Sequence, residues 1–114
     1  MPRPVWKIAI ALLILGFAHP AAAQTAVKIT EILRSPGTYN EHDVAVFGKV
    51  EGLTVGVQYA TFRICGSRCL NVLVWGHPRI SEGQALNVRG RFHLVKHLDH
   101  HRLHHVIEVE HGAL

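Results

Sequence analysis

Hydrophobic and polar residues alternate along most of the chain after residue 40, and glycines separate the alternating runs. A period of two residues is typical of strands that bury one face. We expect a strand in each of five such runs, 44–50, 59–65, 69–75, 85–95 and 103–109. Gly48 and Gly90 lie inside two of the runs, where a small barrel needs a sharp bend. The pattern therefore predicts an all-β protein, built as a five-stranded small barrel that is closed or partly open.

The alternation also assigns an inward-facing set of residues to each strand. The expected core residues are Val44, Val46, Val50, Ala60, Phe62, Ile64, Leu70, Val72, Val74, Leu86, Val88, Phe92, Leu94, Leu103, Ile107 and Val109. A helical period precedes the first strand, because residues 27–33 place apolar side chains three and four positions apart. Ser35-Pro36-Gly37 follows directly, so we expect one short N-terminal helix that stops there.

The first 23 residues have the pattern of a secretory signal peptide. Arg3 and Lys7 precede an apolar run at 8–18, which is too short to span a bilayer, and three alanines occupy 21–23. We expect cleavage after Ala23, which leaves residues 24–114 as one domain in the periplasm or outside the cell. No transmembrane segment is expected in that mature chain.

Charge and composition narrow the classes of function. The chain has 12 Lys plus Arg and 8 Asp plus Glu, and removal of Arg3 and Lys7 with the leader lowers its formal charge from +4 to +2. So small a charge disfavours, without excluding, a nucleic-acid partner. The acids are scattered, and neither a nucleophile elbow nor a phosphate-binding glycine loop is present. We therefore expect a binding protein and not an enzyme.

Several segments resemble the OB-fold domains of exported bacterial proteins, related in pattern to the anticodon-binding type. The matching pieces are ITEILRSPGTY, VAVFGKV, TFRI, LNVLVWG and EGQALNVRGRF, and the resemblance covers about residues 28 to 110. It implies an OB-type barrel, but these motifs encode barrel bends and identify a fold much better than a function. A haem chaperone of the cytochrome maturation kind is also an exported OB barrel. That family keeps a membrane anchor and an H-x-x-x-Y motif, and this chain has neither.

The two cysteines flank the shortest predicted hairpin. A three-residue turn at 66–68 places Cys65 opposite Cys69, on the outward face because Ile64 and Leu70 point inward. In an oxidising compartment this pair is expected to form a disulfide that holds the strand register. The alternative is a redox or copper pair, but the spacing matches neither C-x-x-C nor C-x-x-C-H, and no proline follows Cys69.

The same register brings a second set of side chains onto the outward face. Arg63 lies opposite Asn71, and Tyr59 lies opposite Trp75. OB domains bind oligonucleotides and oligosaccharides on this pair of strands, with aromatic side chains as stacking platforms. These four residues are therefore a candidate ligand site. The alternative is that Tyr59 and Trp75 pack on each other or under the N-terminal helix.

Histidines are concentrated in the last hairpin. If Arg89 pairs with Glu108, then His93 faces His104 on the outer surface, below a six-residue loop. The resulting candidate ligands for a Zn, Cu or Ni ion are His93, His97, His100, His101 and His104. The alternative is a solvated hairpin whose histidines become charged near pH 6. We take metal binding as the leading hypothesis and the oligomeric ligand as its rival.

Overall fold

The computed structural model describes residues 25–114, and the predicted signal peptide lies outside this range. Among the described residues, no helix is both long enough and apolar enough to cross a membrane. The elements are β1 (Thr25–Ala26), α2 (Ile29–Arg34), α3 (Pro36–Tyr39), β2 (Asp43–Val55), β3 (Tyr59–Cys65), β4 (Cys69–Trp75), β5 (Ala85–His97) and β6 (Arg102–Val109). All five predicted strands are present as β2 to β6, and the predicted helix is present as α2.

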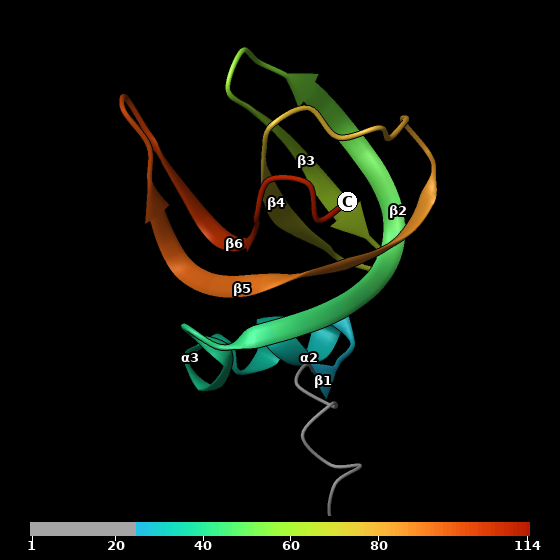
Figure 1. Ribbon diagram of the computed structural model, residues 1–114. Coiled ribbons are helices and arrows are strands. Elements are labelled where there is room, and N and C mark those ends of the chain that lie inside the picture. The colour runs from blue at the N-terminus through green and yellow to red at the C-terminus, as the bar shows by residue number, and fades with distance from the viewer. Residues whose placement is uncertain (1–24) are drawn as a thin grey trace, which may run out of the picture.

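The five long strands form one sheet that closes in a ring. Their order is β2-β3-β4-β6-β5, and β2 also pairs with β5. The β4–β6 pair is parallel, and the other four pairs of the ring are antiparallel. Figure 1 shows β2 and β5 as strongly curved strands that wrap around the ring, with α2 and α3 below β2.

The core fills the inside of the ring. The hydrophobic cluster consists of Ile29, Ile32, Val44, Val46, Val50, Phe62, Ile64, Leu70, Val72, Val74, Val88, Phe92, Ile107 and Val109. Ile29 and Ile32 come from α2, so this short helix contributes its apolar side to the core. The predicted inward set is confirmed except at Leu86, Leu94 and Leu103, which are only half-buried.

Gly48 and Gly90 lie where strands pass unusually close to each other. A Cβ atom at Gly48 would lie 2.6 Å from the carbonyl oxygen of Cys65 on β3. At Gly90 it would lie even closer to the carbonyl oxygen of Glu108 on β6. Only glycine permits these approaches, because any Cβ would overlap the neighbouring backbone.

Side chains cover two stretches of strand edge that lack a neighbouring strand. The carboxylate of Glu82 accepts hydrogen bonds from the backbone N–H groups of Gly52 (2.8 Å) and Leu53 (3.0 Å), at a bulge in β2. These two bonds hold the pKa of Glu82 below its usual value. On β5, the side-chain oxygen of Asn40 accepts a hydrogen bond from the N–H of Leu94 at 2.9 Å.

The predicted register of the β3–β4 hairpin is confirmed. Tyr59 pairs with Trp75, Arg63 with Asn71, and Cys65 with Cys69. The two cysteines form the expected disulfide, with their Cα atoms 4.1 Å apart. Cys65 was expected to face solvent but is buried, because it lies between Cys69 on one side and β2 on the other.

The predicted register of the β5–β6 hairpin is wrong by two residues. Glu108 pairs with Arg91 in place of Arg89, and His93 pairs with Val106 in place of His104. The strands continue further toward the tip than expected, so that His97 ends β5 and the loop shortens to residues 98–101. Both registers place an arginine of β5 opposite Glu108, so charge pairing could not separate them.

Candidate functional site

Two aromatic side chains lie on the outer face of β3 and β4. The rings of Tyr59 and Trp75 meet edge to face, with centroids 5.5 Å apart and an interplanar angle of 72°. Both side chains are half-buried. The alternative that they pack on each other is therefore confirmed, and each ring still presents part of its surface to solvent.

A groove of about 420 Å³ runs beside Tyr59, between the tips of two hairpins. Its lining comes from the β2–β3 hairpin and from the tip of the β5–β6 hairpin. The residues are Thr54, Gly56, Val57, Gln58, Tyr59, Thr61, His101 and Leu103. Both tips extend beyond the ring on the same side of the molecule in Figure 1. Long-range folding thus brings together side chains more than 40 positions apart.

The lining of this groove combines apolar surface with uncharged polar groups, and it is nearly free of charge. Threonine hydroxyls and the Gln58 amide donate and accept hydrogen bonds, and the Tyr59 ring offers an apolar surface with a polar tip. Val57 is 89% exposed, so it adds apolar surface at the rim. The lining contains no Asp, Glu, Lys or Arg, and its one imidazole belongs to His101. Such a surface suits a neutral ligand that carries hydroxyl or amide groups.

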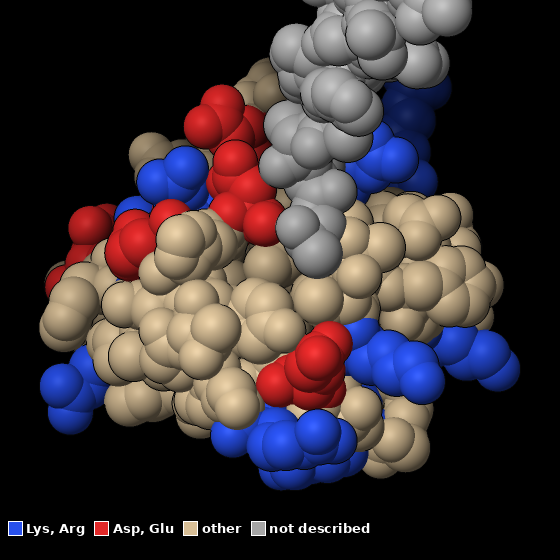
Figure 2. All heavy atoms as spheres, turned by 90° about the horizontal axis from the view of Figure 1, so that it is seen from below, with Lys and Arg blue, Asp and Glu red and all other residues tan. Residues whose placement is uncertain are grey.

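Two basic side chains, one on β3 and one on β5, are matched with carboxylates. Arg63 lies 3.8 Å from Glu51 (Nη2 to Oε1), and Lys96 lies 3.3 Å from Glu108 (Nζ to Oε1). Arg102, between the lining residues His101 and Leu103 in the sequence, is exposed and forms no ion pair with the described residues. Figure 2 shows the molecule from below, on the side away from the two hairpin tips, where acidic side chains also lie close to basic ones. The two ion pairs lower the attraction of Arg63 and Lys96 for a phosphate backbone.

Two of the four predicted ligand residues hold the strands together. The Asn71 side-chain nitrogen donates to the His104 carbonyl at 2.7 Å, which extends the contact between β4 and β6. The Trp75 indole N–H donates to Oε2 of Glu108 at 2.7 Å. Of the predicted set, only Tyr59 therefore lines the groove itself.

A second polar group is centred on His93, the one buried polar or charged side chain among residues 26–114. Its Nδ1 lies 2.8 Å from Oε2 of Glu41, and its Nε2 lies 2.8 Å from Oε1 of Glu108. Glu108 in turn accepts from Trp75, so a chain of hydrogen bonds runs from the α3–β2 connection to the aromatic pair. Sequence reasoning missed this group because Glu41 and Glu108 are 67 positions apart.

Glu108 is held in its ionised form by its neighbours. Burial alone would raise the pKa of this carboxyl group. Hydrogen bonds from Trp75, His93 and Lys96, together with the Lys96 charge, outweigh burial and hold the pKa below its usual value.

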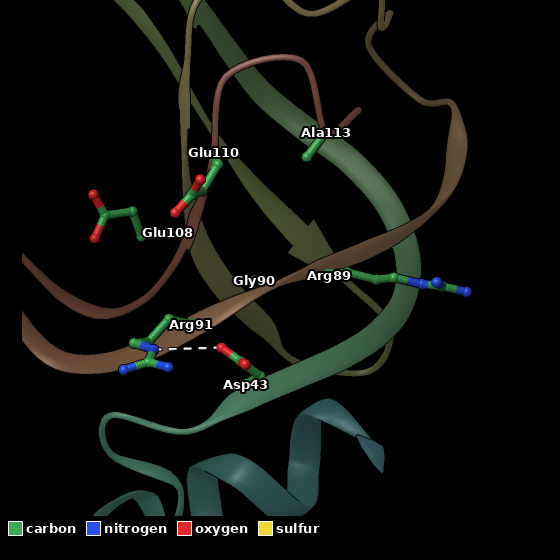
Figure 3. Close-up of a pocket in the computed structure, with 7 residues that line it drawn as sticks. All are labelled: Asp43, Arg89, Gly90, Arg91, Glu108, Glu110 and Ala113. Carbon is green, nitrogen blue, oxygen red and sulfur yellow. Dashed lines mark hydrogen bonds and ion pairs between the residues drawn. The ribbon is translucent and has the colours of Figure 1, made fainter. Parts of the chain in front are cut away.

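A larger hollow of about 760 Å³ adjoins Glu108, lined by Asp43, Arg89, Gly90, Arg91, Glu108, Glu110 and Ala113. Figure 3 shows the Arg91–Asp43 ion pair on one side of it, while the Arg89 side chain extends to the other side. Nε of Arg91 lies 3.3 Å from the Asp43 carboxylate. The two arginine side chains point to opposite sides of the hollow and do not converge on one point, so we do not assign a ligand to it.

The structure separates the predicted metal ligands. His97, His100, His101 and His104 are exposed near the tip of the β5–β6 hairpin, whereas His93 is buried with both ring nitrogens against carboxylates. Only one group of three ligand atoms within 4.8 Å of one another occurs in the described part of the chain, at Glu51, Cys65 and Cys69. Its two sulfurs are already bonded to each other. Metal binding by the four exposed histidines stays a prediction, without His93.

Comparison with protein-family models and with curated proteins gives no match for this chain. The assignment of a function therefore depends on the geometry of the groove and on the side chains around it.

Proposed function

We propose that this protein is an exported OB-type barrel that binds a neutral oligosaccharide in the groove between its two hairpin tips. The observation that carries the proposal is the nearly uncharged lining of that groove, in which hydroxyl and amide groups lie beside apolar surface and the half-buried ring of Tyr59.

The order of strands supports the OB-type assignment. Counted from β2, the ring runs first, second, third, fifth and fourth strand, and closes back on the first. OB-type barrels use the outer face of the second and third strands, with the loops 1–2 and 4–5, to bind oligonucleotides and oligosaccharides. In this chain those elements are β3, β4, residues 56–58 and residues 98–101. All of them except β4 contribute side chains or backbone to the groove.

The lining favours a sugar over a nucleic acid, because it holds no Lys or Arg that would contact a phosphate. Arg63 and Lys96 already have carboxylate partners, so a phosphate would have to compete with Glu51 and Glu108. A sugar instead needs hydroxyl and amide partners and an aromatic surface, and Thr54, Gln58 and Tyr59 supply them. Export is supported by the signal-like leader and by the disulfide, since disulfides persist in oxidising compartments.

The test is a calorimetric titration of the protein with chitohexaose, maltohexaose and a 12-nucleotide oligothymidylate. We expect binding of at least one of the sugars, with little dependence on salt. Tyr59→Ala and Leu103→Ala should each weaken that binding by about tenfold, because each removes apolar surface from the groove. The spectrum of backbone amides should show that both variants stay folded.

Phe47→Ala is the matched control, because Phe47 is an aromatic side chain that is 64% exposed and lies outside the groove. Equal losses from Phe47→Ala and Tyr59→Ala would contradict the proposed site. Preferential binding of the oligothymidylate, falling steeply with salt, would assign the groove to nucleic acid instead. Absence of binding to all three probes would reject the proposal for these ligands.

A further inference from the structure

His93 has a hydrogen-bond partner on each side that can only accept. An ionised carboxylate has no proton to donate, and both Glu41 and Glu108 present a carboxylate oxygen 2.8 Å from a ring nitrogen. A neutral imidazole carries one N–H and one lone pair. Both contacts are hydrogen bonds at the same time only when His93 is an imidazolium.

The charged groups around His93 come from three parts of the fold. Glu41 precedes β2, Glu108 lies on β6, and Lys96 lies on the same strand as His93 and contacts Glu108. Arg91, also on β5, is paired with Asp43 at the start of β2. The other titratable side chains of the adjoining β6 segment are His104, which is exposed, and His105, which stacks on Phe92. Two carboxylates therefore face one imidazolium and one ammonium group.

Glu41 adds a second reason for this arrangement. Its backbone has a φ of 64°, a left-handed conformation that is unfavourable for a residue with a Cβ. Its N–H donates to the Phe92 carbonyl at 2.7 Å, and its side chain contacts His93. The corner before β2 is thus fixed to β5 from both the backbone and the side chain.

The hydrogen bonds that begin at Glu41 and His93 continue through Glu108 to the binding face. Glu108 accepts from the Trp75 indole through Oε2 while His93 and Lys96 contact Oε1. The Trp75 ring packs edge to face with Tyr59, and Tyr59 lines the groove. The orientation of Tyr59 is therefore connected to His93 through two intervening side chains.

We propose that His93, as an imidazolium, is a positioning residue for the groove, which orients Glu108 and through it Trp75 and Tyr59. Only the expected effect of His93 on ligand binding rests on the proposed function; its effect on Trp75 does not. When His93 loses one ring proton, its positive charge disappears. One of the two carboxylates, Glu41 or Glu108, then faces a lone pair of the imidazole in place of an N–H group. The hydrogen bond between Glu108 and Trp75 then changes, and the aromatic pair loosens.

The experiment follows the Trp75 indole N–H by two-dimensional NMR between about pH 5.5 and pH 8.5, the range in which histidines titrate. The resonance is assigned by comparison with Trp75→Phe. We expect it to shift in the same step as the ring resonances of His93, without any ligand present. His93→Gln should abolish that step, whereas the matched control His104→Gln, at an exposed position on the adjoining strand, should preserve it.

An indole resonance that does not follow His93, or that titrates unchanged in a folded His93→Gln variant, would overturn the proposal. If His93→Gln does not fold, the wild-type titration alone decides, because a positioning role requires the two steps to coincide. With a sugar that binds, the affinity should be about threefold lower at pH 8.5 than at pH 5.5. Failure of every sugar to bind would count against the proposed function, and the indole titration would still decide the role of His93.

Discussion

The two hairpins that border the outer face of the sheet differ in how their register is determined. The β3–β4 hairpin has a three-residue turn, and a disulfide joins Cys65 to Cys69 directly beside that turn. The β5–β6 hairpin has a four-residue loop and no covalent bond, and its strands cross closely at Gly90. In the first hairpin the turn and the cysteines specify one pairing. In the second, pairing depends on packing at the crossing and on the contacts of Glu108 with side chains of β4 and β5.

The contrast shows what alternation of polar and apolar residues can and cannot determine. A shift of two residues keeps every side chain on its original face of the sheet, so the core pattern is the same in either register. Arg89 and Arg91 are two positions apart and both suit Glu108 electrostatically. A register that neither pattern nor charge distinguishes is decided by tertiary contacts.

The largest expected effect comes from the crossing at Gly90. In Gly90→Ala the new Cβ would overlap the Glu108 backbone, so we expect the free energy of unfolding to fall by about 3 kcal/mol or more. Gly66→Ala, in the turn of the other hairpin, is the matched control, because no atom lies within 4 Å of its added Cβ. Urea unfolding measures both variants. Similar losses at the two positions would show that the crossing is not specially constrained.

Reduction of the disulfide should have the next largest effect. The bond closes a loop of five residues, for which the chain-entropy model gives about 2 kcal/mol of stabilisation. We expect unfolding with and without a dithiol reductant to differ by about this amount, and the intact mass to rise by about 2 Da on reduction. The β3–β4 pairing should survive, as judged from cross-strand nuclear Overhauser effects. A mass that does not change would mean that the cysteines are free thiols.

Glu108 connects the two hairpins and should make stability depend on pH. Its pKa is lower in the folded chain than the ordinary value of 4.5, so the carboxylate stabilises the fold at neutral pH. This contribution is lost as the pH falls from about 4.5 through the lower folded-state value. We expect Glu108→Gln to destabilise by about 1 kcal/mol at pH 7, and by less at pH 3. A loss that is the same at both pH values would contradict the role of the charge.

The smallest effect on stability is expected at the tip of the β5–β6 hairpin. His97, His100, His101 and His104 are exposed, so their joint replacement by glutamine should change the free energy of unfolding by less than about 0.5 kcal/mol per residue. Calorimetric titration with Zn²⁺, Cu²⁺ and Ni²⁺ tests the metal hypothesis on the same variant. If these residues bind metal, affinity should fall in this variant and not in His42→Gln. If the wild type, the four-glutamine variant and His42→Gln bind the metals equally, the tip is a solvated hairpin without a metal site.

Much of the fold was predictable from local pattern, and less of the site was. Alternation located the five long strands, and the three-residue turn gave the partners of Tyr59 and Cys65 correctly. Neither the alternation nor the turn could show that Cys65 is covered by β2, since burial of an outward residue depends on the neighbouring strand. The groove combines Thr54, Thr61 and Leu103, whose positions along the chain carry no shared motif. The partners of His93 were equally hidden, because Glu41 and Glu108 meet only after the ring has closed.

The carboxylate of Glu82 has a consequence for how separate copies of the chain meet. A strand edge with bare N–H groups is a template on which another chain can add a strand. On β2, the groups of Gly52 and Leu53 that would serve this purpose are occupied by Glu82. Its lowered pKa means that the cover persists well into the acidic range and weakens only when the carboxylate gains a proton. Strong acid should therefore expose the N–H groups of this edge, and self-association would begin there, with the ring of strands still intact.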